Sequence, residues 1–373
     1  MFSLFIITIA ISAIPISVYL IYIIAALTSR PIPPDQIDPL PDISIVIPAY
    51  NEESGISDRI DNLAEVYPKE KMEIIVSNDG SIDNTEKMAL DSLKKHSIKG
   101  KVITNPRSGV NAAINRGTKE TSNQIIVIAG ADGLFDKNTI PHLVSVLLSK
   151  DDIGAVSGDL VPVPKGESMF SKSESAYRSI YGRICTWESK VHSTYCFNGP
   201  VVAFRKKAAS SLNTRRGADD ASMALSVIRN GFRCQYVPTA KFYEYVPDKF
   251  KEQRRQKIRR ATRLLEATFF NRDVLSRKYG SFGLFIFPLR LLMFFIVPTL
   301  FFISIFLWAF LLWNINPVYG TGFIGIIGLI LLIGSFKTNV VSSFIIYQFY
   351  LFMGLFNMLR DVHTWEPTER VKI

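Results

Sequence analysis

The hydrophobic residues of the chain gather toward its two ends. Residues 2–27 and 291–313 are apolar runs without a charged side chain, and residues 319–335 and 339–358 are two further apolar segments. A helix needs about 20 consecutive apolar residues to cross the hydrocarbon core of a bilayer. We therefore predict four membrane spans, one before the central part of the chain and three after it.

The first apolar run is long, and its flanks indicate a membrane anchor. A cleaved signal peptide is the alternative, but it carries a basic start and an apolar core of only about 7–15 residues. Arg30 follows the run directly, and basic residues beside a span favour the cytoplasmic side. The central part is therefore expected in the cytoplasm, joined to the anchor by a proline-rich linker.

The other end of the chain is more complex. Residues 279–290 mix aromatic side chains with Arg290 and are expected to lie flat at the membrane interface. Four spans would place the tail, residues 360–373, across the membrane from the central part. The basic residues Arg360, Arg370 and Lys372 favour the opposite arrangement, so the side of the tail stays open.

These patterns divide the chain into four parts. They are an N-terminal transmembrane helix (1–30), a soluble domain (31–278), an interfacial helix with about three spans (279–359) and a tail (360–373). Within the soluble domain, three short runs rich in β-branched residues alternate with three amphipathic segments. The runs are residues 43–47, 74–76 and 125–128, and the amphipathic segments lie near 54–67, 83–96 and 109–120. This alternation predicts an α/β fold with a mostly parallel sheet and right-handed crossovers.

Polar side chains follow each of the three predicted strands. Asn51, Asp79 and Asp132 come just after them, at the sheet edge where α/β proteins bind ligands. Asp79 and the nearby Asp83 suit hydrogen bonds to a base and a ribose. Asp132 suits a hard divalent cation that neutralises a diphosphate. The alternative is that these residues only form turns and helix caps.

The charge balance narrows the class of partner. The chain has 43 Lys and Arg against 33 Asp and Glu, a net charge of +10. Such a balance permits nucleic acid, an anionic membrane or a phosphorylated substrate, and the apolar ends favour the membrane. Residues 251–263 hold seven basic side chains, which suit a diphosphate or an anionic lipid surface. A nucleic-acid partner would explain neither the strand-end carboxylates nor the spans, and we expect none. The cysteines and histidines are scattered, without the spacing of a zinc site.

Two adjacent carboxylates, Asp219 and Asp220, precede an amphipathic segment at residues 221–230. Adjacent carboxylates repel each other, and burial would raise the pKa of one of them. A carboxylate with a raised pKa in a closed pocket suits a general base. The alternative is that one of them caps the helix and interacts with its positive end.

Several short segments follow one another in an order typical of one enzyme family. They are ISIVIPAYNEE (43–53), IIVSNDGSIDNT (74–85), RSGVNAAIN (107–115), GAD (130–132), CFNGP (196–200) running on to FRK (204–206), DD (219–220), QKIRR (256–260) and WEPTER (365–370). Together they resemble the membrane-bound family 2 glycosyltransferases, particularly the synthases of hyaluronan, chitin oligosaccharides and cellulose. The resemblance implies a GT-A catalytic domain and an inverting single displacement on a nucleotide sugar.

The resemblance also implies a role for each matched position. The residues that would bind the donor nucleotide are Pro48, Tyr50, Glu52, Asp79, Arg107 and Asp132. Asp132 would also hold the divalent metal, Mg²⁺ or Mn²⁺. Asp220, with Asp219 beside it, would be the base that deprotonates the acceptor hydroxyl. The residues that would line the diphosphate and the acceptor are Gln256, Arg259, Arg260, Asn198 and Gly199.

Three positions depart from the pattern of this family. Gly130 replaces the first aspartate of the Asp-x-Asp motif, so only Asp132 remains for the metal. Val110 replaces a lysine near the nucleotide. Arg260 replaces a tryptophan, and an arginine suits a phosphate where an aromatic ring suits a sugar. This last change favours a lipid-phosphate acceptor or a single sugar addition.

We therefore predict a membrane-anchored inverting glycosyltransferase that acts at the cytoplasmic face. Its donor is a nucleotide sugar, with a UDP-sugar favoured, and its acceptor is lipid-linked or a polysaccharide. The alternative, which rests on Gly130, is a non-catalytic membrane scaffold that keeps the fold to support a partner synthase.

Overall fold

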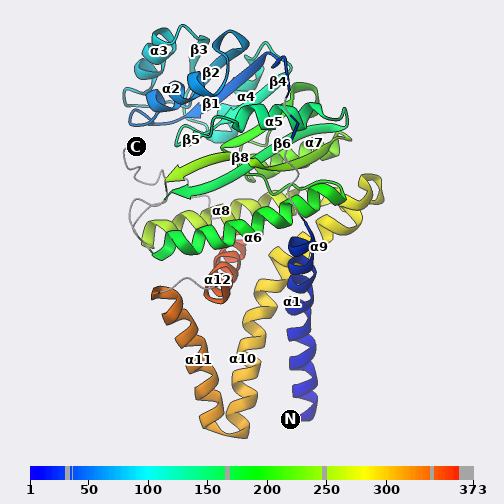
Figure 1. The fold of residues 1–373 in the computed structure, drawn as a ribbon. Helices are drawn as coiled ribbons and strands as arrows, with labels where there is room; N and C mark the ends of the chain where they lie inside the picture. Colours follow the sequence, from blue (N-terminus) through cyan, green and yellow to red (C-terminus); the bar gives the residue numbers. More distant parts are fainter. Residues whose placement is uncertain (30–33, 36, 164–168, 246–249, 337–339, 361–373) are drawn as a thin grey trace.

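One mixed sheet of eight strands forms the centre of the soluble domain in the computed structural model, which describes residues 1–29, 34–35, 37–163, 169–245, 250–336 and 340–360 (Figure 1). The tail motif at residues 365–370 lies outside the described residues. The strand order is β3-β2-β1-β4-β7-β6-β8-β5. The strands are β1 (Ile43–Ala49), β2 (Met72–Asn78), β3 (Lys99–Thr104), β4 (Ile125–Ala129), β5 (Gly133–Phe135), β6 (Ile153–Val163), β7 (Val201–Arg205) and β8 (Arg233–Tyr245).

The first half of the sheet is parallel, as the alternation of runs predicts. β1 pairs in parallel with β2 and β4, and β2 pairs in parallel with β3. The crossover helices are α2 (Ile56–Val66), α3 (Thr85–Lys95) and α4 (Val110–Lys119). The three predicted strands are confirmed because their β-branched side chains are buried on both faces of the sheet. β3 was not predicted, since it is an edge strand whose side chains are largely exposed.

The second half of the sheet mixes directions. β7 is antiparallel to both β4 and β6, β8 is parallel to β6, and β5 is antiparallel to β8. The helices of this half are α5 (Thr139–Leu148), α6 (Met169–Val191), α7 (Asp219–Arg229) and α8 (Phe250–Phe270). In Figure 1, α6 and α8 lie beneath the sheet, between it and the long apolar helices. They therefore form the floor of the catalytic domain.

The two faces of the sheet bury two separate hydrophobic cores. Ile45 and Ile47 of β1 point into one of them, and Val46 points into the other, as the two-residue period of a strand requires. The core around Val46 continues into Tyr22 of α1 (Phe2–Thr28) and Phe287 of α9 (Phe287–Leu291). The soluble domain and the long apolar helices thus share one continuous core.

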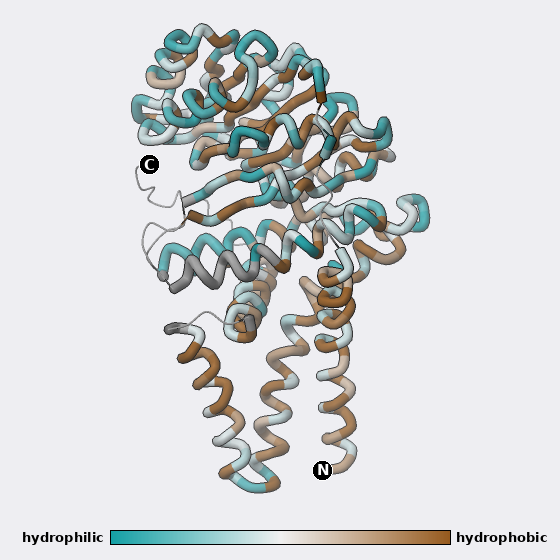
Figure 2. The backbone as a smooth tube through the Cα atoms, in the orientation of Figure 1, coloured by the Kyte–Doolittle hydropathy of each residue, from teal (hydrophilic) through white to brown (hydrophobic). Residues whose placement is uncertain are grey.

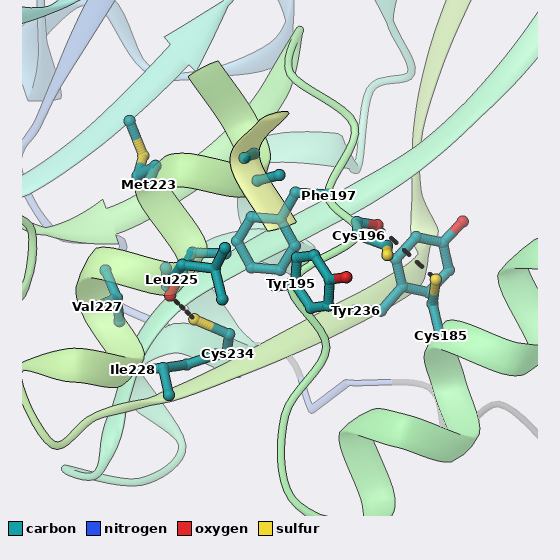
Figure 3. Packing of buried hydrophobic residues seen from close by; sticks show 14 of the residues in the cluster. Cys185, Tyr195, Cys196, Phe197, Met223, Leu225, Val227, Ile228, Cys234 and Tyr236 are labelled. Atoms are coloured by element: carbon teal, nitrogen blue, oxygen red, sulfur yellow. Dashed lines mark hydrogen bonds between the residues drawn. The ribbon is translucent and has the colours of Figure 1, made fainter. Parts of the chain in front are cut away.

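Figure 3 shows part of this shared core, including all three cysteines. Cys185, Cys196 and Cys234 are buried as free thiols. The Cys185 thiol lies 3.7 Å from the carbonyl oxygen of Cys196, and the Cys234 thiol lies 3.3 Å from that of Ala224. All three act as small packing residues, as their scattered spacing indicates.

Within the part of the chain that the structure describes, four helices are long and apolar enough to cross a membrane. They are α1, the continuous helix Phe282–Ile315, α11 (Pro317–Phe336) and α12 (Val340–Leu359). The second contains α9 and α10 (Val297–Ile315), with two short π-helical segments at Phe282–Ile286 and Leu292–Ile296. Figure 2 shows α1, α10 and α11 as predominantly hydrophobic rods below a domain with a mainly hydrophilic surface.

The start of this long helix packs inside the protein. Phe282, Ile286 and Phe287 are completely buried, and the ring of Tyr195 lies 6.1 Å from that of Phe282 and 5.6 Å from that of Phe287. Residues 279–290 were expected to lie flat at the membrane interface. That position stays a prediction: Phe282, Ile286 and Phe287 pack into the core, whereas Leu284 and Phe285 of the same segment are exposed.

α12 is oriented differently from α10 and α11. The ring of Phe344 lies 5.3 Å from Phe301 of α10, and that of Phe352 lies 5.4 Å from the adjacent Phe302. Phe344 and Phe352 are separated by about 12 Å of helix. Because both meet the same turn of α10, α12 crosses that helix instead of running beside it.

The C-terminal half of α12 lies against α8. A Cβ added at Gly354 would lie 3.1 Å from side-chain atoms of both Ala261 and Leu265. Leu351, Leu355 and Met358 pack against the shared core, and Figure 1 places α12 directly beneath the domain. α12 therefore ends on the underside of the catalytic domain.

Candidate active site

A cavity of about 510 Å³ extends from the strand ends of the sheet to the membrane helices. Most of the site residues predicted from the sequence line this cavity, and they come from five separate segments of the chain. Those that line it are Pro48, Glu52, Asp132, Asn198, Gly199, Asp219, Asp220, Arg259 and Arg260. Asp132 and Asp220 are far apart in the sequence, and the crossing of β4, α7 and α8 brings them to one site.

Asp132 lies between β4 and β5, where the chain leaves the parallel half of the sheet. Its pKa is raised to about 6, chiefly by burial and then by the nearby carboxylate of Glu244. The positive charges of Arg260 and Arg59 act in the opposite direction. Asp132 therefore faces the cavity in surroundings that a bound cation would stabilise.

Gly130 leaves no room for a side chain beside Asp132. A Cβ at this position would lie 2.8 Å from the Cβ of Pro200 and 2.9 Å from Oδ1 of Asp132. The Gly130 amide also donates to the Pro200 carbonyl at 3.1 Å, which fixes this close approach. The local backbone thus has no room for the first aspartate of the Asp-x-Asp motif, which agrees with the glycine found at position 130.

The described residues hold no cluster of three His, Cys, Asp or Glu side chains that would bind a metal alone. Asp132 faces the cavity, and Glu244 contributes a second carboxylate near it. Mg²⁺ commonly takes one or two carboxylates and completes its shell with water and substrate phosphates. This donor set fits a divalent cation that arrives with a diphosphate.

Asp219 and Asp220 belong to the first turn of α7 and line the same cavity. Burial raises the pKa of both carboxyl groups, and the neighbouring charge of Asp219 helps to bring that of Asp220 to about 7. The Asp220 carboxylate accepts the Ala221 amide at 2.7 Å. Gly199 permits this arrangement, because a Cβ there would lie 3.0 Å from Oδ2 of Asp219.

The positive charge of Arg260, on α8, acts both on Asp132 and on the Asp219–Asp220 pair. Its guanidinium pairs with Glu244 at 2.5 Å, and its charge lowers the pKa of Asp132, Asp219 and Asp220 alike. The pKa of Arg259 is lowered by burial and by the adjacent arginines of α8. A cluster of repelling cations beside a cavity is suited to an anionic ligand.

Asp79 uses its carboxylate to hold the loop that follows β3. The backbone amides of Ser108 and Gly109 donate to it at 2.9 and 2.7 Å. Arg116 of α4 pairs with it at 2.7 Å, and Arg107 approaches to 3.9 Å. Asp79 thus fixes the shape of the loop that carries Arg107, one of the predicted donor-binding residues.

Two other polar residues of these strand-end loops also stabilise the backbone. Asp83 accepts the Thr85 amide at 3.1 Å, just before α3, whose N-cap residue is Asn84. Asn51 has a positive φ of 54° and accepts the Ile82 amide at 3.0 Å. The loops after β1 and β2 are therefore tied to each other.

Arg107 covers the ring of Tyr50, with its guanidinium carbon 3.1 Å from the ring centre. Both residues belong to the predicted donor-nucleotide set. Arg107 also lines a second cavity of about 660 Å³, where Lys251, Arg254 and Arg255 of α8 lie opposite. Tyr50 and Arg107 therefore do not line the main cavity, and Arg107 lines the second one.

The segment before β7 is fixed by α6 and β6. Asn198 accepts from Arg178 at 2.8 Å and donates to the Gly158 carbonyl at 2.8 Å. Tyr181 donates to the Cys196 carbonyl at 2.7 Å. These bonds hold Asn198 and Gly199 at the cavity wall, whereas Gln256 is half-buried on α8 and does not line this cavity.

Sequence reasoning missed several charged residues that organise the site. Arg59 is completely buried, stacks 3.8 Å from the centre of the Phe135 ring and donates to the Gly133 carbonyl beside Asp132. The signal for it was a cation between Ile56 and Ile60 on the apolar face of α2. Glu244, Arg116 and Arg178 gave no such signal, because their partners are far away in the sequence.

Arg290 and Glu188 form a second missed group, at the junction of domain and membrane helices. Arg290 is 1% exposed and pairs with both oxygens of Glu188, at 2.6 and 3.0 Å. Thr194 donates to the same carboxylate at 2.6 Å. A buried pair with both oxygens engaged fixes the long helix against α6.

Comparisons with known proteins agree with this geometry. Residues 44–211 match the family model described as glycosyl transferase family 2. Two curated relatives are each 27% identical: a probable glycosyltransferase, YdaM, of Bacillus subtilis, and a poly-beta-1,6-N-acetyl-D-glucosamine synthase of Staphylococcus aureus. The matches cover 69% and 70% of this chain but only 64% and 62% of the relatives, so the chain spans less than two thirds of either length.

A solved structure is similar over nearly the whole chain. The mannosyltransferase PcManGT of Pyrobaculum calidifontis, solved with GDP-mannose and Mn²⁺, superposes with a TM-score of 0.80 at 23% identity. The superposition covers 96% of this chain and 99% of that one. At this identity the likeness establishes the fold, including the arrangement of the apolar helices.

Residues 44–211 therefore carry a glycosyl transferase family 2 domain, and the soluble part of the chain has the GT-A fold. The family and the fold that the motif order predicts are both confirmed. The next questions concern the reaction, the donor and the acceptor, which depend on the residues of this chain.

Proposed function

We propose that the protein is an inverting glycosyltransferase that moves a sugar from a nucleotide diphosphate to an acceptor reaching it from the membrane. One observation carries this proposal. Two carboxylates with raised pKa values, Asp132 and Asp220, line one cavity, and the charge of Arg260 acts on both. A cation site and a base in one cavity are what a single displacement requires.

Asp220 is the base in this proposal. A pKa near 7 makes its carboxylate basic enough to take a proton from a hydroxyl while still ionised at neutral pH. The acceptor oxygen then forms a bond to C1 of the donor sugar as the bond to the diphosphate breaks. The proton moves to Asp220, and the electron pair of the broken bond leaves with the nucleoside diphosphate.

The other side of the cavity binds the leaving group. Asp132, with Glu244 nearby, would hold Mg²⁺ or Mn²⁺ together with the diphosphate. When bound, the cation neutralises charge that develops on the diphosphate. Arg259 and Arg260 add fixed positive charge at the same wall, and arginine is well suited to phosphate oxygens.

The base of the donor is assigned to the loop beside Tyr50 and Asp79. Arg107 covers the Tyr50 ring, so a base that stacks on this ring must displace its guanidinium. The motif resemblance favours a UDP-sugar, whereas the solved mannosyltransferase of the same fold holds GDP-mannose. The test below therefore includes both nucleotides.

We place the catalytic domain at the cytoplasmic face of a membrane. The packing of α12 across α10 and onto α8 favours three crossings, with α12 at the interface, over the four that the sequence predicts. In this arrangement the tail lies on the side of the catalytic domain, as Arg360, Arg370 and Lys372 favour. A cysteine in place of Arg360 should then react with a membrane-impermeant maleimide only from the catalytic side.

The test of the reaction uses membranes that contain the wild-type protein or Asp220→Asn. Labelled UDP- and GDP-sugars are supplied with Mg²⁺ or Mn²⁺, or with EDTA. We expect metal-dependent transfer of label by the wild type and a loss of at least about a hundredfold in Asp220→Asn, the usual effect of removing a general base. Equal transfer by both proteins would refute Asp220 as the base. Absence of both transfer and donor binding would instead favour the scaffold alternative.

A further inference from the structure

One short stretch of chain, residues 194–200, contacts both sides of the proposed reaction, and we call it the wall segment. The Pro200 carbonyl accepts the amide of Gly130 at 3.1 Å, two residues before the proposed metal ligand. The Gly199 backbone amide donates to the carboxyl group of Asp220. The C-terminal end of the wall segment therefore lies between the loop of the metal ligand and the proposed base.

The rest of the wall segment is attached along one face of α6. Tyr181 donates to the Cys196 carbonyl at 2.7 Å, and Thr194 donates to the Glu188 carboxylate at 2.6 Å. Figure 3 shows Cys196 beside Cys185 of the same helix, whose thiol lies 3.7 Å from the Cys196 carbonyl oxygen. Tyr181 and Glu188 are seven residues apart, so both lie on one face of α6. The wall segment thus follows α6 toward the apolar helices.

Glu188 is the point at which this arrangement meets the apolar helices. Arg290 of the long helix donates to both of its carboxylate oxygens, at 2.6 and 3.0 Å. The Tyr22 hydroxyl of α1 lies 3.5 Å from the same carboxylate. Glu188 and Arg290 are at most 1% exposed. One buried carboxylate therefore has partners on the wall segment, on α1 and on the long helix.

Stability alone does not account for an ion pair at this position. Burying two charges costs a large desolvation free energy, and well-packed apolar side chains often stabilise a fold equally well or better. A guanidinium that engages both oxygens of a carboxylate instead fixes a relative orientation, which apolar contacts do not. The pair is therefore suited to setting geometry, and Arg290 lines the main cavity whose geometry is at issue.

We propose that Glu188 and Arg290 are positioning residues for the transfer reaction, whose pair holds the wall segment and thereby places Asp220 opposite the metal side of the cavity. This inference rests on the proposed function and adds two residues to it. The pair acts through Thr194 and the backbone of Gly199. A displacement of the long helix relative to α6 would reach the base along the wall segment.

A double variant separates positioning from stability. Glu188→Met combined with Arg290→Met removes both charges and leaves no unpaired ion in the core. We expect its thermal unfolding temperature to be no lower than that of the wild type. We expect kcat for transfer of label from the nucleotide sugar in membranes to fall about ten- to a hundredfold, the effect of a misplaced reacting group. The Kd for the nucleotide sugar with Mn²⁺ should stay constant. Wild-type kcat in the folded double variant would overturn the proposal.

Two threonines give a matched test that keeps the ion pair intact. Thr194→Val removes the hydrogen bond to Glu188, whereas Thr186→Val removes only a bond to the Gly182 carbonyl within α6, at 2.8 Å. Both threonines are buried, so the two substitutions are equally conservative. We expect kcat to fall about three- to tenfold in Thr194→Val, the effect of one buried hydrogen bond, and to stay constant in Thr186→Val. Equal rates in the two variants would contradict the proposed route through Thr194.

Hydrogen exchange follows the wall segment without turnover. Amide exchange of the full-length protein in detergent is measured for the peptide that contains residues 196–200. We expect it to be at least about tenfold faster in Thr194→Val and in the double variant than in the wild type or Thr186→Val. Unchanged exchange would show that the pair does not hold the segment. A wild type that neither binds nor transfers a nucleotide sugar would instead refute the proposed function, and the positioning role with it.

Discussion

The two halves of the cavity are built in different ways. The donor half consists of loops that follow parallel strands, and nearly every polar group there is held by a neighbouring loop, as Asp79 is by the amides of Ser108 and Gly109. The proposed acceptor half is assembled from α6, α7 and α8 in the middle of the chain and from α1 and α12 near its two ends. The comparison teaches that loops at strand ends can be combined with a cavity whose shape depends on helices distant in the sequence.

The largest expected effects are those of substituting Asp132 and Asp220, and the two variants should differ in whether they still bind the donor. Asp132→Asn and Asp220→Asn should both lower kcat by about 10²–10⁴-fold, since one removes the proposed metal ligand and the other the proposed general base. Only Asp132→Asn should also abolish metal-dependent binding of the nucleotide sugar. Isothermal titration with the nucleotide sugar and Mn²⁺ measures this difference. Loss of donor binding in Asp220→Asn would contradict the division.

The pH dependence of kcat should reflect the titration of Asp220, in the proposed acceptor half of the cavity. Burial and Asp219 raise the pKa of Asp220 to about 7, so below this pH the carboxyl is protonated and cannot accept a proton. With saturating donor, kcat should fall about tenfold for each pH unit below 7. The free energy of unfolding should change in the opposite direction. Because the pKa of Asp220 is higher in the folded than in the unfolded chain, ionising this carboxyl lowers the stability of the fold as pH rises from about 4 to 7. A rate that is flat from pH 5.5 to 8 would exclude Asp220 as the titrating base.

A smaller effect is expected in the donor half alone. Arg107→Ala removes the guanidinium that covers Tyr50 and approaches Asp79. We expect the KM for the nucleotide sugar to change by about five- to tenfold, in line with 1–1.4 kcal/mol for a partly exposed cationic contact. The KM for the acceptor should stay constant in the same assay. Lys278→Ala is a suitable control, because Lys278 lies 5.5 Å from the Tyr279 ring and lines neither cavity.

The smallest expected effect concerns the packing between the two halves. Gly130→Ala would place a Cβ 2.8 Å from the Cβ of Pro200, so the backbone between β4 and β5 must shift. We expect a destabilisation of about 1–3 kcal/mol, typical of overpacking. Thermal unfolding of the detergent-solubilised protein measures it. Gly322→Ala on α11 is the matched control, because an added Cβ there meets no atom within 4 Å.

Much of the donor half could be predicted from the sequence. β1, β2 and β4 contain continuous runs of β-branched residues; Pro48 ends the run in β1, Asp79 follows β2 directly, and Asp132 comes three residues after β4. The sequence could not predict that the Asp79 carboxylate pairs with Arg116, since β3 and most of α4 separate the two residues. It also gave no reason for Gly130, which becomes clear only from its contact with Pro200.

The acceptor half was predicted less completely. Asp219 and Asp220 were identified by their adjacency, but the partnership of Arg260 with Glu244 joins a helix and a strand that periodicity alone does not pair. Hydropathy predicts that both α11 and α12 cross the membrane, because both are apolar segments of about 20 residues. Only their packing distinguishes them, with α11 facing outward and α12 resting on α8.

The sequence by itself determined the local features of this protein. It specified which segments are strands, which are apolar helices and which carboxylates stand at strand ends, because these depend on neighbours a few residues apart. The tertiary structure alone decided that Asp132, Asp220 and Ile23 line one cavity. Their meeting depends on the crossing of distant helices, and the free energy of that packing comes from side chains that no local pattern brings together.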